Sequence, residues 1–222
     1  MKIENKRVIP TVFAIDKGEF NERFNKLIKI SGKIQIDLMD GKFVEVKSIE
    51  LGELPNLRRY NNEFEVHLMA FNPESFILEL KKKGFKKIIF HYEAIEDQDR
   101  IKNLIKRIQD FNLEAWIAIN PETNIAEILP FIHKVDGVLF LGHAPGVEHM
   151  NLESNVVEKI EKLRKNAKRL KIQIDGGVNL DNIEKLGKMR VNYVNVGSFI
   201  SNNSNPKKSL IELERRFAKA WP

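Results

Sequence analysis

The sequence predicts an α/β protein that folds as a (β/α)8, or TIM, barrel, and two observations lead to this prediction. Short runs rich in β-branched and aromatic residues alternate with longer amphipathic stretches. There are eight such runs, and strands that alternate with helices form parallel sheets, of which the eight-unit barrel is one form. An open doubly wound sheet is the second candidate. It is less well supported, because the turn after the first run lacks the glycine-rich pattern of such sheets.

The predicted strands lie at residues 7–14, 33–38, 64–68, 87–91, 115–119, 137–141, 171–174 and 193–196. Amphipathic stretches follow most of them and predict helices at residues 19–30, 73–83, 97–111, 124–132, 153–170, 179–188 and 206–220. The segment after the second strand, residues 47–54, is a weak helix candidate. Strand and helix units therefore repeat from one end of the sequence to the other.

The length of the chain, 222 residues, allows one large domain or two small ones at about 150 residues per domain. No linker, low-complexity segment or break in composition divides the sequence. We therefore expect a single domain over residues 1–222.

The composition excludes several classes of protein. With no cysteine, disulfides, thiolate chemistry and cysteine zinc sites are impossible. No segment approaches the ~20 apolar residues of a membrane span, and the first residues lack the apolar core of a secretory signal, so we expect a cytoplasmic protein without a membrane partner. The net charge of +6 permits an anionic ligand. The lysine-rich stretches of the sequence are typical of solvated helix surfaces. Nucleic-acid binding is therefore the weakest hypothesis for a partner.

Polar side chains end several predicted strands, at the end of a barrel where active sites form. Gln35 and Asp37 alternate with isoleucines in the second strand, and Gln173 and Asp175 repeat that pattern in the seventh. Because successive side chains of a strand point to opposite faces, each such pair shares a face. His67 ends the third strand. A single Asp or His there most often satisfies hydrogen bonds at the barrel rim, but the three together favour a site.

Two carboxylates and a histidine suit proton transfer at a carbon beside a carbonyl. One carboxylate removes a proton and the other delivers one to the opposite face. A divalent cation held by the histidine and the aspartates would stabilise the enediolate oxygens that develop. Glycines after the seventh and eighth strands, Gly176, Gly177 and Gly197, add backbone N–H groups of the kind that bind phosphate in barrels, although tight turns also require glycine.

A series of motifs occurs in order along nearly the whole chain. They are Ile9-Pro10-Thr11, the segment from Asp37 to Val44, His67-Leu68-Met69, Asn72-Pro73, His91-Tyr92-Glu93-Ala94, Asn120-Pro121, Pro145-Gly146, Asp175-Gly176-Gly177-Val178 and Gly197-Ser198. On these motifs the sequence resembles the ribulose-phosphate 3-epimerase family, whose members are metal-dependent (β/α)8 enzymes. The MDGxFV segment and the HLM triplet are the most specific parts of the resemblance.

The resemblance implies a role for each matching residue. Asp37 and Asp175 would be the catalytic acid and base, and with His67 they would bind a divalent metal, Zn, Mn, Fe or Mg. The residues implied to surround the sugar and its phosphate are Thr11, Met39, Met69, Gly146, Gly176, Gly177, Gly197 and Ser198. The implied partner is a phosphorylated ketose, and we expect a homo-oligomer.

Two departures from the family pattern fall in this site. Gln35 stands where the family has a histidine that ligates the metal, and a neutral amide oxygen is a weaker ligand for most metals than imidazole. The loop after the sixth strand has lost a pair of glycines, and it carries Glu148, which can add negative charge near a phosphate.

The resemblance implies an isomerase of carbohydrate metabolism, in the pentose phosphate pathway. Its reaction would interconvert ribulose 5-phosphate and xylulose 5-phosphate by two-aspartate proton transfer through a metal-stabilised enediolate. Two alternatives stay open: a related barrel enzyme with another phosphosugar substrate, and a metal-free, non-catalytic phosphosugar-binding homologue. Gln35 is the residue on which these alternatives depend.

Overall fold

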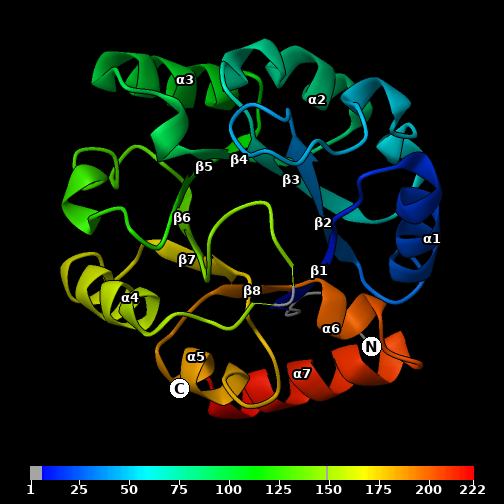
Figure 1. Cartoon of the computed structure of the whole chain (residues 1–222). Coiled ribbons are helices and arrows are strands. Elements are labelled where there is room, and N and C mark those ends of the chain that lie inside the picture. The colour runs from blue at the N-terminus through cyan, green and yellow to red at the C-terminus, as the bar shows by residue number, and fades with distance from the viewer. Residues whose placement is uncertain (1–6, 149) are drawn as a thin grey trace.

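A computed structural model, which describes residues 7–148 and 150–222, shows a closed barrel in which each of eight strands pairs in parallel with its neighbours (Figure 1). The strands are β1 (Val8–Val12), β2 (Lys33–Met39), β3 (Glu63–Met69), β4 (Lys87–His91), β5 (Glu114–Ile119), β6 (Gly137–Leu141), β7 (Lys171–Asp175) and β8 (Tyr193–Val196). The predicted (β/α)8 barrel is confirmed, and an open sheet is excluded because β8 pairs with β1.

Helices surround the barrel and cover its outer face (Figure 1). They are α1 (Lys17–Leu27), α2 (Ile77–Lys83), α3 (Gln98–Asp110), α4 (Ser154–Asn166), α5 (Ile183–Lys188), α6 (Ser198–Ser201) and α7 (Pro206–Ala220). In α3, buried Ile101, Leu104, Ile105 and Ile108 recur at helical spacing and form the face that packs on the barrel. None of the described helices is long and apolar enough to cross a membrane.

The predicted helix at residues 124–132 is wrong. The structure has only a short 3-10 helix there, η5 (Ile125–Glu127), followed by turns. Pro130 explains the difference, because a proline lacks the N–H that would bond to the carbonyl of Ala126, and its ring clashes with that carbonyl. After β2 the chain likewise forms only the 3-10 helices η1 (Leu51–Glu53) and η2 (Leu57–Arg59).

The interior of the barrel is apolar on one side and polar on the other. The apolar side is a cluster of Ile89, Trp116, Ala118, Leu139 and Leu141. Trp116 fills the space beside Gly137, where a Cβ would lie 2.5 Å from the indole ring. The polar side comes from inward-facing residues of β2, β3, β4, β7 and β8, and it lies directly beneath the residues that the sequence predicts as a site.

The first and last elements of the chain are joined. Strand β1 pairs with β8, and Glu214 of α7 accepts hydrogen bonds from the backbone N–H of Arg7 (3.3 Å) and of Val8 (3.1 Å). The guanidinium of Arg7 stacks 3.6 Å from the ring centre of Trp221. The last helix therefore holds the first strand at the seam where the barrel closes.

Candidate active site and metal centre

A pocket of about 350 Å³ opens at the carboxyl-terminal ends of the strands. Most of the predicted site residues line it, namely Thr11, Asp37, His67, Met69, Gly146, Asp175, Gly176, Gly177, Gly197 and Ser198. Met39 packs in a small buried cluster with Val44 and Met69, and Gln35 lies one step deeper on β2 and is fully buried. Thr11 Oγ1 is buried without a hydrogen-bond partner, which leaves it able to bond a ligand.

Asp37, His67 and Asp175 converge at the bottom of this pocket. Nδ1 of His67 lies 3.3 Å from Oδ2 of Asp175 and 3.6 Å from Oδ1 of Asp37. All three side chains are nearly buried, with exposed fractions of 7% for Asp37, 1% for His67 and 9% for Asp175. The alternation of side chains along β2, β3 and β7 therefore places the predicted residues together, as the sequence pattern indicates.

Gln35 lies between the two aspartates. Its Nε2 donates hydrogen bonds to Oδ1 of Asp37 (2.8 Å) and to Oδ2 of Asp175 (2.5 Å), the same two oxygens that face His67. Its Oε1 accepts a hydrogen bond from Nδ2 of Asn195 (2.8 Å). The amide thus presents hydrogen atoms, rather than its oxygen, to the carboxylates.

A second chain of contacts fixes the imidazole of His67. Its Nε2 lies 2.9 Å from Nε2 of His91, whose Nδ1 lies 3.1 Å from Oε2 of Glu93. Because the ionised carboxylate only accepts, neutral His91 carries its proton on Nδ1, and its bare Nε2 accepts from His67. Neutral His67 then has a bare Nδ1 that points at the two aspartates, which is the tautomer that binds a metal.

Burial and charge shift the pKa values of these groups. Burial raises the pKa of Asp37 to about 6, and the neighbouring Asp175 also raises it, while His67 and Gln35 lower it. Burial lowers the pKa of His67, but Asp175 and Asp37 outweigh that effect and raise it to about 9. Burial lowers the pKa of His91 to about 4, so this imidazole is neutral. A carboxyl that titrates near neutral pH suits proton transfer.

The residues at the bottom of the pocket fit a divalent cation. One ligand atom each from Asp37, His67 and Asp175 lies within 4.8 Å of the others. Nδ1 of His67 is buried and makes no well-formed hydrogen bond, although a buried polar atom normally has a partner. Two carboxylates and one imidazole are ligands that Zn²⁺, Mn²⁺ and Fe²⁺ accept.

The described part of the loop between β6 and α4, residues 142–148 and 150–153, lies across the mouth of the barrel (Figure 1). Gly146, with a φ of 79°, packs on Val44, where a Cβ would lie 3.1 Å from the valine Cβ. Gly176 and Gly177 also have positive φ values, 98° and 70°, and side chains there would collide with His143 and with the backbone of Leu152. Backbone conformation and packing account for these glycines, and phosphate binding by them stays a prediction.

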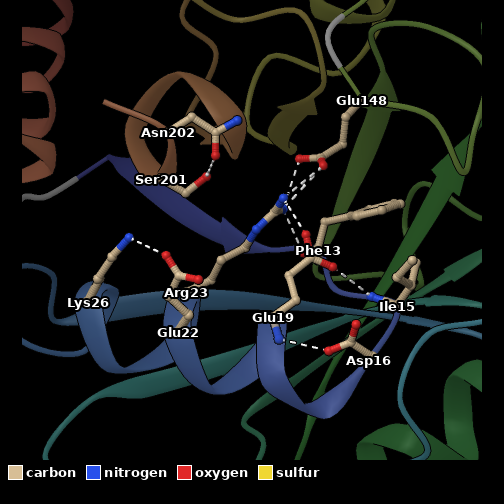
Figure 2. Close-up of polar contacts among 10 residues, drawn as sticks. All are labelled: Phe13, Ile15, Asp16, Glu19, Glu22, Arg23, Lys26, Glu148, Ser201 and Asn202. Atoms are coloured by element: carbon tan, nitrogen blue, oxygen red, sulfur yellow. Dashed lines mark hydrogen bonds and ion pairs between the residues drawn. The ribbon is translucent and has the colours of Figure 1, made fainter. Parts of the chain in front are cut away.

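An ion pair joins this loop to α1 (Figure 2). Nη1 of Arg23 donates to the carbonyl of Phe13 (2.6 Å) and to Oε1 of Glu148 (3.1 Å), and Nη2 donates to Oε2 of Glu148 (3.2 Å). Oε1 of Glu148 lies 3.8 Å from the place where a Cβ on Gly197 would be. The negative charge expected from Glu148 is therefore beside the predicted phosphate position, and Arg23 offsets it.

Comparisons with known proteins agree with this geometry. A family model described as the ribulose-phosphate 3 epimerase family matches residues 7–201. The chain belongs to the ribulose-phosphate 3-epimerase family. This family member is 28% identical to the ribulose-phosphate 3-epimerase of Schizosaccharomyces pombe, over 96% of this chain and 95% of that protein. It is 32% identical to the enzyme of the same name from Chlamydia pneumoniae, over 80% of each chain. Because this is a family of epimerases, the protein is an isomerase.

Solved structures share its fold at low sequence identity. A 3-hexulose-6-phosphate synthase from Salmonella typhimurium superposes with a TM-score of 0.73 at 11% identity, over 96% of this chain and 99% of the synthase. The orotidine 5'-phosphate decarboxylase of Pyrococcus horikoshii gives a TM-score of 0.67 at 13% identity, over 95% of this chain and 99% of the decarboxylase. At such low sequence identity, the similarity of these two structures to this protein shows only that they share the barrel fold.

Several residues around the site have no role in the sequence-based prediction. His91 and Glu93 occur in the motifs of the resemblance. They lie two residues apart at the end of β4, and this spacing is the signal in the sequence that predicts a contact between them. Lys87 and Asn195 point into the barrel from their strands, as the site residues do. The alternation of side chains predicts that direction, but it does not predict which other polar residue each one contacts. Arg23 gives no signal, because its contact with Glu148 joins α1 to a distant loop.

Proposed function

We propose that the protein is a ribulose 5-phosphate 3-epimerase that uses Asp37 and Asp175 for proton transfer. The observation that supports this most strongly is the convergence of two carboxylates from β2 and β7 at the bottom of one pocket, with a single amide group hydrogen-bonded to both. Carboxylates on two sides of a substrate carbon provide the two opposite faces that an epimerisation requires.

In the proposed reaction, one of the two carboxylates removes the proton from the carbon next to the carbonyl. The electron pair of that C–H bond forms the carbon–carbon double bond of an enediolate, and the carbonyl oxygen gains negative charge. The other aspartate, in its protonated form, then donates a proton to the opposite face of the same carbon. In the metal-free protein, burial and the neighbouring Asp175 raise the pKa of Asp37 to about 6, so its protonated and ionised forms are both accessible near neutral pH.

Asp37, His67 and Asp175 would hold a divalent cation, which supplies positive charge beside the developing enediolate oxygens. His91 and Glu93 keep the Nδ1 of His67 directed at that position. Thr11 Oγ1 has a free hydrogen bond for the sugar. Gly197 and Ser198, at the end of β8, are the proposed phosphate ligands.

The direct test is exchange of solvent deuterium into ribulose 5-phosphate, measured by NMR with Mg²⁺, Mn²⁺, Zn²⁺ or Fe²⁺ added in turn and with a chelator. We expect exchange at a single carbon, together with formation of xylulose 5-phosphate, and we expect the chelator to stop both. An absence of exchange with every cation would contradict the proposal and favour a metal-free phosphosugar-binding role.

A second candidate is an epimerase or related enzyme for another phosphorylated sugar. The carboxylate of Glu148 beside Gly197 favours it, because a negative charge there changes the space and the field that a phosphate meets. A panel of pentulose and hexulose phosphates separates the two, since a much higher kcat/KM for a sugar other than ribulose 5-phosphate would favour this second candidate. A cytoplasmic location and a homo-oligomeric state stay predictions.

A further inference from the structure

Five polar side chains form a continuous network inside the barrel, directly below the carboxylates. They are Gln35, Glu65, Lys87, Gln173 and Asn195, and none is more than 8% exposed. Burying polar groups is unfavourable unless every one has a partner, and a buried charge is more costly still. A network of this size in the core therefore needs an explanation beyond filling the barrel.

The contacts run in one line from Lys87 to the candidate site. Nζ of Lys87 donates to Oε1 of Gln173 (3.0 Å), and Nε2 of Gln173 donates to Oδ1 of Asn195 (2.6 Å). Nδ2 of Asn195 donates to Oε1 of Gln35 (2.8 Å), whose Nε2 donates to both Asp37 and Asp175. Along this line each amide accepts from the group nearer Lys87 and donates to the group nearer Asp37 and Asp175.

The chemistry of the end groups fixes this direction. An ammonium group has hydrogens to donate and no lone pair to accept with, so Gln173 must present its oxygen to Lys87. The carboxylate of Glu65 only accepts, and it takes hydrogen bonds from the amide nitrogens of both Gln173 and Asn195, in addition to its ion pair with Lys87 (2.6 Å). Turning any one amide around would bring two donors or two acceptors face to face.

Lys87 is itself firmly placed. Its Nζ lies 4.1 Å from the ring centre of Trp116 and 5.0 Å from that of Tyr193, so aromatic faces cover the sides that the polar partners leave open. The ammonium group of Lys87, at the start of the line, is thus held by an ion pair, a hydrogen bond and two aromatic rings.

We propose that Lys87 and Glu65 are a pair of positioning residues that act through Gln173 and Asn195 to keep Gln35 a hydrogen-bond donor to Asp37 and Asp175, including when these residues hold a cation. This rests on the metal site of the proposed function. Its consequence is that the protein contributes three ligands and withholds the oxygen of Gln35. Three protein ligands are typical of catalytic metal sites, because they leave coordination positions open for substrate oxygens.

The network acts against the arrangement that a bound cation would favour. Nε2 of Gln35 bonds the same two oxygens, Oδ1 of Asp37 and Oδ2 of Asp175, that face Nδ1 of His67. A cation shared by those oxygens would be repelled by the amide hydrogens and attracted by the amide oxygen. A Gln35 free to rotate by half a turn would therefore become a fourth ligand, and cation binding would become tighter.

The test is a double-mutant cycle of Mn²⁺ affinity, measured by titration calorimetry on the metal-stripped protein. The proteins are the wild type, Glu65→Gln/Lys87→Met, Gln35→Met and the variant that combines all three substitutions. Glu65→Gln/Lys87→Met removes both charges, and a glutamine at position 65 can donate as well as accept, so the amides lose their fixed direction. We expect this change to tighten Mn²⁺ binding at least threefold, and we expect it to have no effect once Gln35 is replaced by Met. Lys33→Met is the matched control, because Lys33 also lies near Tyr193 (5.4 Å) but pairs with Glu63 outside the network.

Replacing both charged residues leaves no unpaired buried charge to prevent folding. Glu65→Met/Lys87→Met is the second variant and repeats the cycle if the first does not fold. Unchanged or weaker Mn²⁺ binding in the folded variants, or an equal change with and without Gln35, would overturn the role of Lys87 and Glu65. If the wild type binds no Mn²⁺, the proposed metal site fails separately. A Gln35-dependent gain of binding in the variants that lack both charges would even then support the positioning role, and no binding in any variant would overturn it.

Discussion

The two sides of the pocket are built in different ways. On one side, Asp37, His67 and Asp175 stand on strands, and further buried residues hold each of them from behind. On the other side, the predicted phosphate position is made of loops, where Gly177 approaches the backbone of Leu152 and Glu148 reaches across to Arg23. The sheet thus fixes the side that carries the carboxylates and the histidine. Loop packing and one ion pair fix the side where phosphate is predicted to bind.

This difference matches what each side would have to do. Proton transfer needs carboxylates held at a defined distance from the reacting carbon, since small displacements cost much of the rate. Binding a phosphate tolerates more variation, because several N–H groups and charges share the contact. Substitutions on the strand side should therefore change the rate by large factors, and those on the loop side should change affinity by small ones.

The largest effect is expected for Asp175→Asn. Removing one of the two proton-transfer groups should stop deuterium exchange at one face of the carbon, and so lower the rate at which the two epimers interconvert about 10³-fold, within the usual contribution of general acid–base catalysis. The melting temperature should change by less than about 4 °C, because an amide oxygen can still accept from Gln35, and the lost pairing with His67 is offset in part by the lost repulsion between the two carboxylates. Exchange is measured by NMR and melting by calorimetry, with Asp110→Asn on the surface of α3 as the control. A large loss of stability with little loss of exchange would make Asp175 a structural residue.

The next effect is a pH dependence of stability in the metal-free protein. The pKa of His67 is raised from 6.5 to about 9 in the folded state, so its contribution to the free energy of unfolding is complete below pH 6.5 and is lost as the pH rises through about 9. The size of this contribution is at most ~3 kcal/mol.

Urea unfolding in the presence of a chelator, at about pH 6 and about pH 9.5, measures this contribution as the difference between the wild type and His67→Asn. We expect the difference to shrink at the higher pH. His133→Asn, at an exposed position outside the site, is the control. An equal difference between wild type and His67→Asn at both pH values would contradict the ion pair of His67 with the two aspartates.

The smallest effect is expected on the loop side, for Glu148→Gln. The glutamine can still accept from Arg23, but the negative charge beside Gly197 is gone, so KM for the phosphorylated substrate should fall about threefold, as expected for a partly exposed charge. Steady-state kinetics at low and high salt measure it, and high salt should reduce the effect. Glu19→Gln is the matched control, because Glu19 pairs with the same arginine (2.6 Å) from α1. A higher KM would show that the ion pair serves mainly to hold the loop in place.

The strands could be predicted from the sequence because their signal is local. Runs of β-branched residues mark them, and alternation places Asp37, His67 and Asp175 on the inner face. The predicted helix at residues 124–132 is wrong because Pro130 prevents a continuous helix in a segment whose amphipathic pattern favours one.

The partners of the site residues could not be predicted in the same way. The contact of Lys87 with Gln173 and that of Arg23 with Glu148 join residues 86 and 125 positions apart in the chain. Which polar groups meet there depends on how the barrel closes, and on rotamers that no local pattern encodes. The sequence thus indicated Gln35 as the unusual residue, while the direction of its amide follows only from the structure.

The seam between β1 and β8, held by Glu214, has a consequence for folding during synthesis. The ribosome makes β1 before the other strands, and β2, which pairs with one edge of it, follows soon after. The partner of its other edge, β8, follows some 180 residues later, so at about 5–20 residues per second that edge waits roughly 10–40 s. The hydrogen bonds from Glu214 to the start of β1 form later still. The nascent chain therefore carries an unpaired strand edge for most of its synthesis, and such an edge is a template on which another chain can pair.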